Sequence, residues 1–146
     1  LSLPVCHYSI VATPPQKLKL LQRIPHFDSV DKNGLATVHY LFKSDLGGTS
    51  FYRHRKTGFE FIDENRTFDY YSSLESENDG ENMPGSGYID GDTALFERIA
   101  EQKGVFNRLI VYRRNSLHSG SISKNFILDP NPLSGRLSIS TFLDPK

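Results

Sequence analysis

The sequence predicts a single, mainly β domain of the sandwich or jelly-roll type, interrupted by a two-helix insertion at about residues 63–104. Short runs of β-forming residues recur in both halves of the chain, separated by turn sequences such as DKNG (31–34) and DLGG (45–48). The middle of the chain changes to helical spacing and a glycine-rich loop. The length of 146 residues is that of one ordinary domain, so residues 1–146 are expected to form one unit.

The first half of the chain contains three predicted strands. Runs of β-branched and aromatic residues place them at 5–12, 36–42 and 49–55. The segment 22–28 is expected to be extended, because Ile24 precedes Pro25 and this position disfavours helix.

The insertion is expected to contain two helices joined by a loop. Asp63 is a suitable N-cap for a helix over 63–77 whose apolar stripe is formed by residues at a spacing of three, namely Phe68, Tyr71 and Leu74. Residues 78–91 are rich in glycine and polar residues and predict a loop. Asp92 can cap a second helix that ends at Gly104, with the apolar residues Leu95, Phe96, Ile99 and Ala100.

Strand character returns after the insertion. Strands are predicted at 108–112, around His118 within 116–122, at 125–128 and at 136–143. The insertion therefore joins two β halves, and a site between them would draw residues from both. Long segments of this kind are either lids over a site or covers for a sheet, and the sequence favours neither.

Charge and cysteine content narrow the function classes. Lys and Arg together number 17, as do Asp and Glu, and the resulting net charge of zero disfavours a nucleic-acid partner. One cysteine, Cys6, allows no internal disulfide, so a reducing, cytoplasmic compartment is expected. No apolar run is long enough to span a membrane, and no membrane partner is expected. The chain begins without Met and inside a predicted strand. We therefore expect that it derives from a longer parent protein whose N-terminal part is missing here.

The sequence Pro25-His26-Phe27-Asp28 offers two metal ligands. Side chains alternate along an extended strand, so His26 and Asp28 project to the same side. A second histidine, for which His118 is the candidate, would complete a 2-His-1-carboxylate triad, the ligand set of non-haem Fe(II) oxygenases. The alternative is a hydrogen-bonded surface pair at His26 and Asp28, with His118 a hydrogen-bonded loop histidine.

The last predicted strand adds a candidate anion site. Arg136 opens this strand and Ser138 lies on the same face. A buried arginine can hold a carboxylate through two parallel hydrogen bonds, a geometry that lysine cannot copy, and a nearby hydroxyl can bind the same carboxylate. The alternative is an ion-paired surface arginine.

In combination these motifs resemble the Fe(II)/2-oxoglutarate-dependent oxygenases, closest to the prolyl-4-hydroxylase-like branch. The matching sequences, spread over about residues 5–143, are PHFD, VHYLF followed by GGTSF, LIVY followed by LHSG, and GRLSISTF. The longer pattern also resembles a bacterial group of uncharacterised oxygenases. Phe42 stands where that branch usually has Asn, and the spacing from His118 to Arg136 is longer than in many relatives.

The resemblance implies a cupin-like double-stranded β-helix, without the supporting N-terminal helices of such enzymes. It implies an Fe(II)- and 2-oxoglutarate-dependent dioxygenase acting on an unidentified small-molecule or peptidyl substrate. Fe(II) would bind to His26, Asp28 and His118, and 2-oxoglutarate to Arg136, Ser138 and Tyr40. No catalytic residue beyond the metal ligands is implied, because the metal and the cosubstrate carry the chemistry.

Two other interpretations stay open. The protein is a cupin-like metalloprotein that does not turn over 2-oxoglutarate, or it is a noncatalytic protein-interaction module that uses the insertion as its partner surface. The basic hairpin, residues 53–56 (RHRK), either receives an acidic substrate or is a solvated hairpin tip.

Overall fold

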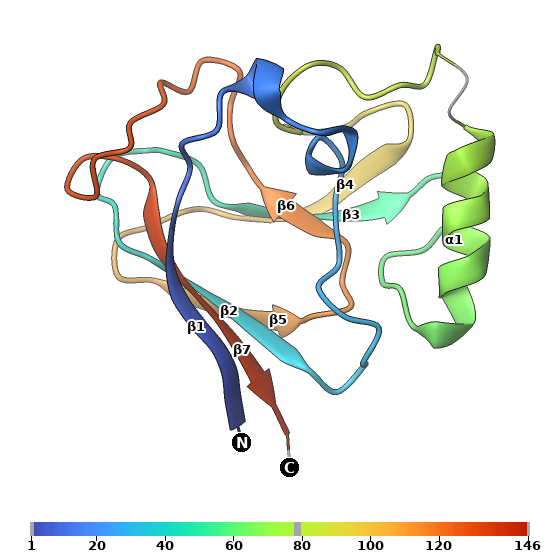
Figure 1. Cartoon of the computed structure of the whole chain (residues 1–146), viewed down its shortest axis with the longest axis horizontal. Coiled ribbons are helices and arrows are strands. Elements are labelled where there is room, and N and C mark those ends of the chain that lie inside the picture. The colour runs from blue at the N-terminus through green and yellow to red at the C-terminus, as the bar shows by residue number, and fades with distance from the viewer. Residues whose placement is uncertain (1, 78–79, 146) are drawn as a thin grey trace.

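Two antiparallel β-sheets form the framework of the protein (Figure 1). The computed structural model describes residues 2–77 and 80–145. The four-stranded sheet has the order β1-β7-β2-β5, and the three-stranded sheet has the order β4-β3-β6. The strands are β1 (Ser2–Ile10), β2 (Leu35–Tyr40), β3 (Thr49–His54), β4 (Phe96–Gln102), β5 (Leu109–Arg113), β6 (His118–Gly120) and β7 (Leu137–Asp144). The helical elements are α1 (Glu64–Ser76) and two short 3-10 helices, η1 (Pro15–Lys17) and η2 (Leu20–Gln22).

The predicted mainly β class is confirmed. The strands expected near 5–12, 36–42, 49–55, 108–112 and 136–143 correspond to β1, β2, β3, β5 and β7, and β6 lies within 116–122. The strand predicted at 125–128 is wrong. Phe126 N–H donates to the carbonyl of Ser123 in a turn, and Ile127 is 84% exposed, so this segment has no neighbouring strand with which to pair.

The predicted first helix is present, but it turns a different face to the protein. The Asp63 carboxylate accepts hydrogen bonds from the N–H groups of Asn65 and Arg66, which confirms the N-cap. Tyr70 is the buried residue of α1, whereas Phe68 of the predicted stripe is 79% exposed. Tyr70 and Leu74 are four residues apart and both pack against the core, so the buried face is rotated away from the predicted one.

The second predicted helix is wrong, because this segment forms strand β4. β4 pairs with β3 in antiparallel register, from His54 opposite Phe96 to Thr49 opposite Gln102. The register shifts at Ile99, since Tyr52 lies opposite Arg98 and Phe51 opposite Ala100. Such a bulge breaks the two-residue alternation of a strand and leaves apolar residues at a helix-like spacing. In its described residues, the insertion between β3 and β4 therefore contains one helix.

Most of the apolar core joins α1 to the three-stranded sheet. This cluster consists of Ile24, Tyr52, Ile62, Tyr70, Ile89, Leu95, Phe96 and Leu117. A smaller cluster, of Tyr40, Phe42 and Ile110, belongs to β2, β5 and the residues that follow β2. By contrast, polar side chains of β6 and β7, such as His118 and Ser138, are buried outside both clusters. Buried polar groups of this kind need partners, and they mark the candidate site.

Among the described residues, no helix is long and apolar enough to cross a membrane.

Candidate metal centre

His26, Asp28 and His118 converge at one point. Their potential ligand atoms all lie within 4.8 Å of one another, which is close enough for one metal ion. The Asp28 carboxylate faces both imidazoles, with Oδ1 3.7 Å from His26 Nε2 and Oδ2 3.6 Å from His118 Nε2. The structure therefore brings together the three ligands that the sequence predicts from two distant segments.

Main-chain hydrogen bonds hold this convergence. The segment that carries His26 pairs with β6 through an isolated antiparallel bridge between His26 and His118. The next ligand along this segment is fixed by a second element, because Asp28 N–H donates to the carbonyl of Arg114 at 2.8 Å. Arg114 follows β5, and its own N–H donates to Gly34. The ligand positions thus depend on backbone pairing and not only on side-chain contacts.

His118 is oriented as a metal ligand through Nε2. Its Nδ1 lies 2.9 Å from the carbonyl of Ser116, and a carbonyl can only accept, so Nδ1 carries the proton and Nε2 keeps its lone pair. Burial lowers the pKa of His118 to about 3, and the neighbouring His26 contributes in the same direction. The imidazole is therefore neutral at pH 7, which is the form that binds metals.

The Asp28 carboxylate lacks a hydrogen-bond partner that its burial requires. Its Oδ2 atom is buried and accepts no hydrogen bond from the residues that the structure describes. Burial raises the pKa of Asp28, and this effect is opposed by His26 and by Arg114. A cation held between Asp28 and the two imidazoles would satisfy this oxygen. Two nitrogen ligands and one oxygen ligand also match the donor set of a non-haem iron site.

The three residues open onto a cavity of about 590 Å³ between the sheets. Inward-facing residues of β1 and β7 line one wall, because the register places Ser9 opposite Ser138 and His7 opposite Ser140. The cavity is lined by His7, Ser9, Val11, Leu21, Gln22, His26, Asp28, Thr37, Val38, Thr49, Tyr88, Tyr112, His118, Ser119, Gly120, Ile122, Arg136, Ser138, Ser140 and Phe142.

Two of the three predicted anion-binding residues also line this cavity. They are Arg136, which directly precedes β7, and Ser138, which lies on β7. Arg136 is only 6% exposed and Ser138 5%. The Arg136 guanidinium donates from Nε to the carbonyl of Leu46 at 2.9 Å and from Nη2 to that of Gly48 at 2.6 Å. These carbonyls fix its orientation but do not neutralise its charge, and no carboxylate of the described residues forms an ion pair with it. The cavity therefore contains a buried, unpaired cation.

Tyr40, the third predicted anion-binding residue, does not line the cavity. It is fully buried beneath the wall, and its hydroxyl lies 2.7 Å from the Thr49 hydroxyl. Thr49 lines the cavity in its place. Tyr40 pairs with Ser138 across β2 and β7, so it lies next to a predicted anion-binding residue.

Several lining residues were not found by sequence reasoning. His7 and Tyr112 lie within ordinary strand patterns, and Tyr88 lies in the loop after α1, so no motif distinguishes them. The only available signal is strand alternation, which places His7 on the same face of β1 as Ser9. Tyr88 donates its hydroxyl proton to the carbonyl of Thr13 at 2.8 Å, which ties the insertion to the segment after β1.

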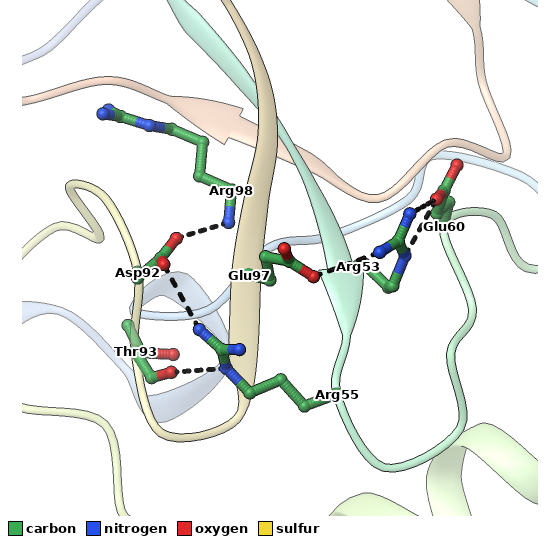
Figure 2. Close-up of polar contacts among 7 residues, drawn as sticks. All are labelled: Arg53, Arg55, Glu60, Asp92, Thr93, Glu97 and Arg98. Carbon is green, nitrogen blue, oxygen red and sulfur yellow. Dashed lines mark hydrogen bonds and ion pairs between the residues drawn. The ribbon is translucent and has the colours of Figure 1, made fainter.

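The arginines of the basic hairpin, residues 53–56, are already paired with carboxylates, which disfavours the interpretation that they receive an acidic substrate. Figure 2 shows that Arg53 lies between Glu60 and Glu97, and that Arg55 contacts Asp92. His54 is fully buried and pairs with a carboxylate of α1's C-terminal end. The hairpin's positive charges are thus largely compensated by carboxylates of the protein itself.

Fold and site together define a two-sheet antiparallel β protein with two histidines and one aspartate close enough to hold a metal ion. The chain belongs to DUF6445, a family of unknown function, whose family model matches residues 1–143. Neither a curated protein nor a solved structure matches the chain.

Proposed function

We propose that this protein is an Fe(II)- and 2-oxoglutarate-dependent dioxygenase. The observation that carries the proposal is that two chemically different sites line one cavity. His26, Asp28 and His118 form the metal-ligand group, and the buried guanidinium of Arg136 is an unpaired cation that suits a carboxylate. A dicarboxylic keto acid could bind the metal through its keto-acid end and Arg136 through its other carboxylate.

The topology supports a jelly-roll, or double-stranded β-helix, fold for this enzyme. The bridge between His26 and His118 places the His26 segment beside β6, as a fourth strand of the second sheet. Each sheet would then have four strands, and the first and last strands, β1 and β7, are neighbours. Eight antiparallel strands in two sheets with crossing connections are the pattern of jelly rolls and cupins.

The protein residues have separate roles in this proposal. His26, Asp28 and His118 would hold Fe(II), and with 2-oxoglutarate bound the iron would supply the oxidation of substrate by O₂, with release of succinate and CO₂. Arg136 would bind the far carboxylate of the cosubstrate, because Nε and Nη2 are held by backbone carbonyls while Nη1 has no partner among the described residues. The hydroxyls of Ser138 and Thr49 lie on the same cavity wall and can bind the same carboxylate.

The cavity wall also limits the substrate. Asp28 and Arg136 are the charged side chains that line it, and the metal and the cosubstrate would occupy both. The remaining wall carries hydroxyl groups, such as those of Ser9 and Ser140, beside apolar groups such as Phe142. A charged group buried there would lose its hydration without gaining an opposite charge. The part of the substrate that reaches the metal is therefore uncharged.

Conversion of 2-oxoglutarate to succinate tests the proposal. Purified protein with added Fe(II) and ascorbate is expected to form succinate slowly without any substrate, and the His26→Ala variant is not. Binding of 2-oxoglutarate to protein loaded with Mn(II) gives a second readout that needs no turnover. Metal binding without 2-oxoglutarate binding or turnover would support the cupin-like metalloprotein instead, and absence of metal binding would leave only the interaction module.

A further inference from the structure

A groove of apolar side chains between η2 and α1 begins at one of the proposed metal ligands (Figure 1). It consists of two adjoining hollows, a smaller one of about 90 Å³ that His26 helps to line and a larger one of about 360 Å³. We call the two hollows together the apolar groove. The volume of the larger hollow lies in the range of small-molecule sites. The apolar side chains of this hollow include Leu20, Leu21, Ile24, Tyr71, Leu74 and Met83.

The apolar groove is continuous with the cavity that contains the candidate metal site. Leu21 lines the cavity and both hollows, and His26 lines the cavity and the smaller hollow. The His26 side chain is 53% exposed, whereas that of His118 is 6% exposed. The metal-ligand group is therefore accessible on its His26 side, where the groove begins. A molecule bound at the metal can extend into the groove without crossing a wall of the protein.

Several apolar side chains of the groove are exposed, although the groove is concave. Leu20, Leu21, Tyr71 and Met83 are between 38% and 66% exposed, and they come from three segments, namely η2, α1 and the loop after α1. Single exposed apolar residues are normal on a protein surface, but a group of them gathered in one hollow indicates a binding site. An apolar ligand group would remove this surface from water, which is favourable.

The charged groups of the groove disfavour an anionic ligand. Glu75 and Glu77 line the larger hollow, and no lysine or arginine of the described residues lines either hollow. Glu77 is paired with the buried His54, whereas Glu75 forms no ion pair within the described part of the chain. A carboxylate or phosphate placed here would lose hydration and meet a like charge. The ligand group that fits the groove is therefore apolar and carries no negative charge.

We propose that the apolar groove binds an aliphatic or aromatic group of the substrate, while the uncharged part of the same molecule that is oxidised lies in the cavity. This inference rests on the proposed function and deepens it, because it names a substrate class, namely neutral molecules that carry an apolar group beside the oxidised position. The groove's continuity with the metal-ligand group favours the substrate as its occupant over a second copy of the chain.

A series of N-acyl glutamine amides tests this inference, because the acyl group can be lengthened from acetyl to octanoyl while the rest of the probe stays the same. Affinity is measured by calorimetric titration into protein loaded with Mn(II) and 2-oxoglutarate. Each methylene that enters the groove should tighten binding by up to about fourfold, so the octanoyl probe should bind at least about 30-fold more tightly than the acetyl probe. With Fe(II) in place of Mn(II), the octanoyl probe should also stimulate succinate formation at a lower concentration.

Two variants show whether the acyl group lies in the groove. Leu20→Asp and Met83→Asp each place a carboxylate in the larger hollow, from two different segments, and neither residue lines the cavity. Each should weaken binding of the octanoyl probe at least about 10-fold. Leu133→Asp is the matched control, because Leu133 is an exposed leucine that lines neither hollow, and it should bind the probe as wild type does. Thermal unfolding verifies that each variant is folded, and either groove variant alone suffices for the test.

The outcomes distinguish the inference from the proposed function. If wild-type protein with Mn(II) binds no 2-oxoglutarate, the proposed function fails and the inference fails with it. If wild type binds 2-oxoglutarate but its affinity for the probes does not rise with acyl length, only the inference is overturned. Unchanged binding of the octanoyl probe to a folded groove variant would also overturn it. A concentration-dependent dimer that Met83→Asp abolishes would assign the groove to a second copy of the chain and overturn it as well.

Discussion

His26 and His118 are joined by both their backbones and their side chains. Each donates its N–H to the other's carbonyl at 2.9 Å, and the ring centroids are 4.3 Å apart. Two imidazoles this close repel each other when both are protonated, and the low pKa of His118 reflects part of that effect. The backbone pairing therefore holds in place a side-chain arrangement that a metal ion would stabilise.

The first prediction concerns metal binding. His118→Ala should reduce Fe(II) or Mn(II) affinity at least about 100-fold, because loss of a direct ligand should exceed the 10–100-fold cost of losing an outer-shell partner. The measurement is anaerobic metal titration, with metal content of the purified protein as a second readout.

His39→Ala is the matched control for this prediction. The His39 imidazole bonds to Asn107, and His39 is not among the residues that line the cavity. Its removal should leave metal affinity unchanged. Equal affinity of wild type and His118→Ala would show that the three side chains do not form a metal site.

The second prediction concerns a variant that should lose affinity for 2-oxoglutarate but keep its affinity for the metal. Arg136→Lys should weaken 2-oxoglutarate binding by about 10- to 100-fold, because lysine lacks the planar fork, while metal affinity stays nearly unchanged. Arg136 also bonds the carbonyls of Leu46 and Gly48, so thermal unfolding must show that the variant is folded. Arg53→Lys, at an arginine paired with Glu60 outside the cavity, is the control. Parallel loss of both affinities in a folded Arg136→Lys protein would contradict the division of roles.

The sequence predicts the convergence of His26, Asp28 and His118 from two simple rules. Alternation along an extended segment places His26 and Asp28 together, and His118 follows a strand by a short turn. It does not predict β4, since the bulge at Ile99 disrupts the strand pattern. It does not reveal that Tyr40 lies behind the cavity wall or that Tyr112 lines the cavity, because the depth of a side chain in the wall depends on how two sheets pack. That depth is set by tertiary packing, and no local sequence pattern indicates it.

The third prediction concerns stability and pH. His54 is fully buried beside Glu77, and burial lowers its pKa from 6.5, while Glu77 opposes the shift and Lys56 adds to it. Below pH 6.5 the unfolded chain binds a proton at this residue that the folded protein does not. The free energy of unfolding should therefore fall as the pH is lowered from about 6.5 towards the lowered pKa, by at most about 1.4 kcal/mol per pH unit for this group.

Urea unfolding at pH 7.5 and 5.5 measures this effect in wild type and in His54→Gln, which keeps a hydrogen-bonding side chain without a titrating group. The loss of stability between the two pH values should be smaller in His54→Gln. An identical pH dependence in both proteins would mean that His54 does not contribute to it.

The fourth prediction concerns the insertion. Tyr88 belongs to the loop after α1, lines the cavity and bonds to Thr13, so the central loop of the insertion reaches the site. If this loop is a lid, hydrogen exchange across Gly80–Gly91 should be fast in the free protein and slow when Mn(II) and 2-oxoglutarate bind. Peptides from α1 serve as the internal reference and should not change. Unchanged exchange in the loop, with ligand binding verified, would indicate a cover for the sheet.

The last prediction concerns the substrate. Because the metal and the cosubstrate would occupy Asp28 and Arg136, the wall near Ser9 and Ser140 offers hydrogen bonds but no opposite charge. In a set of N-acetylated amino-acid amides, members with neutral polar side chains such as glutamine should increase 2-oxoglutarate consumption more than their charged counterparts glutamate and lysine. The measurement is succinate formed per minute at equal probe concentration. His7→Ala, which removes a hydrogen-bonding side chain from this wall, should reduce the stimulation by the neutral probes and leave substrate-free turnover unchanged. Stronger stimulation by glutamate or lysine probes than by the neutral set would show that a charged group can occupy the cavity, and the uncharged substrate class would have to be abandoned.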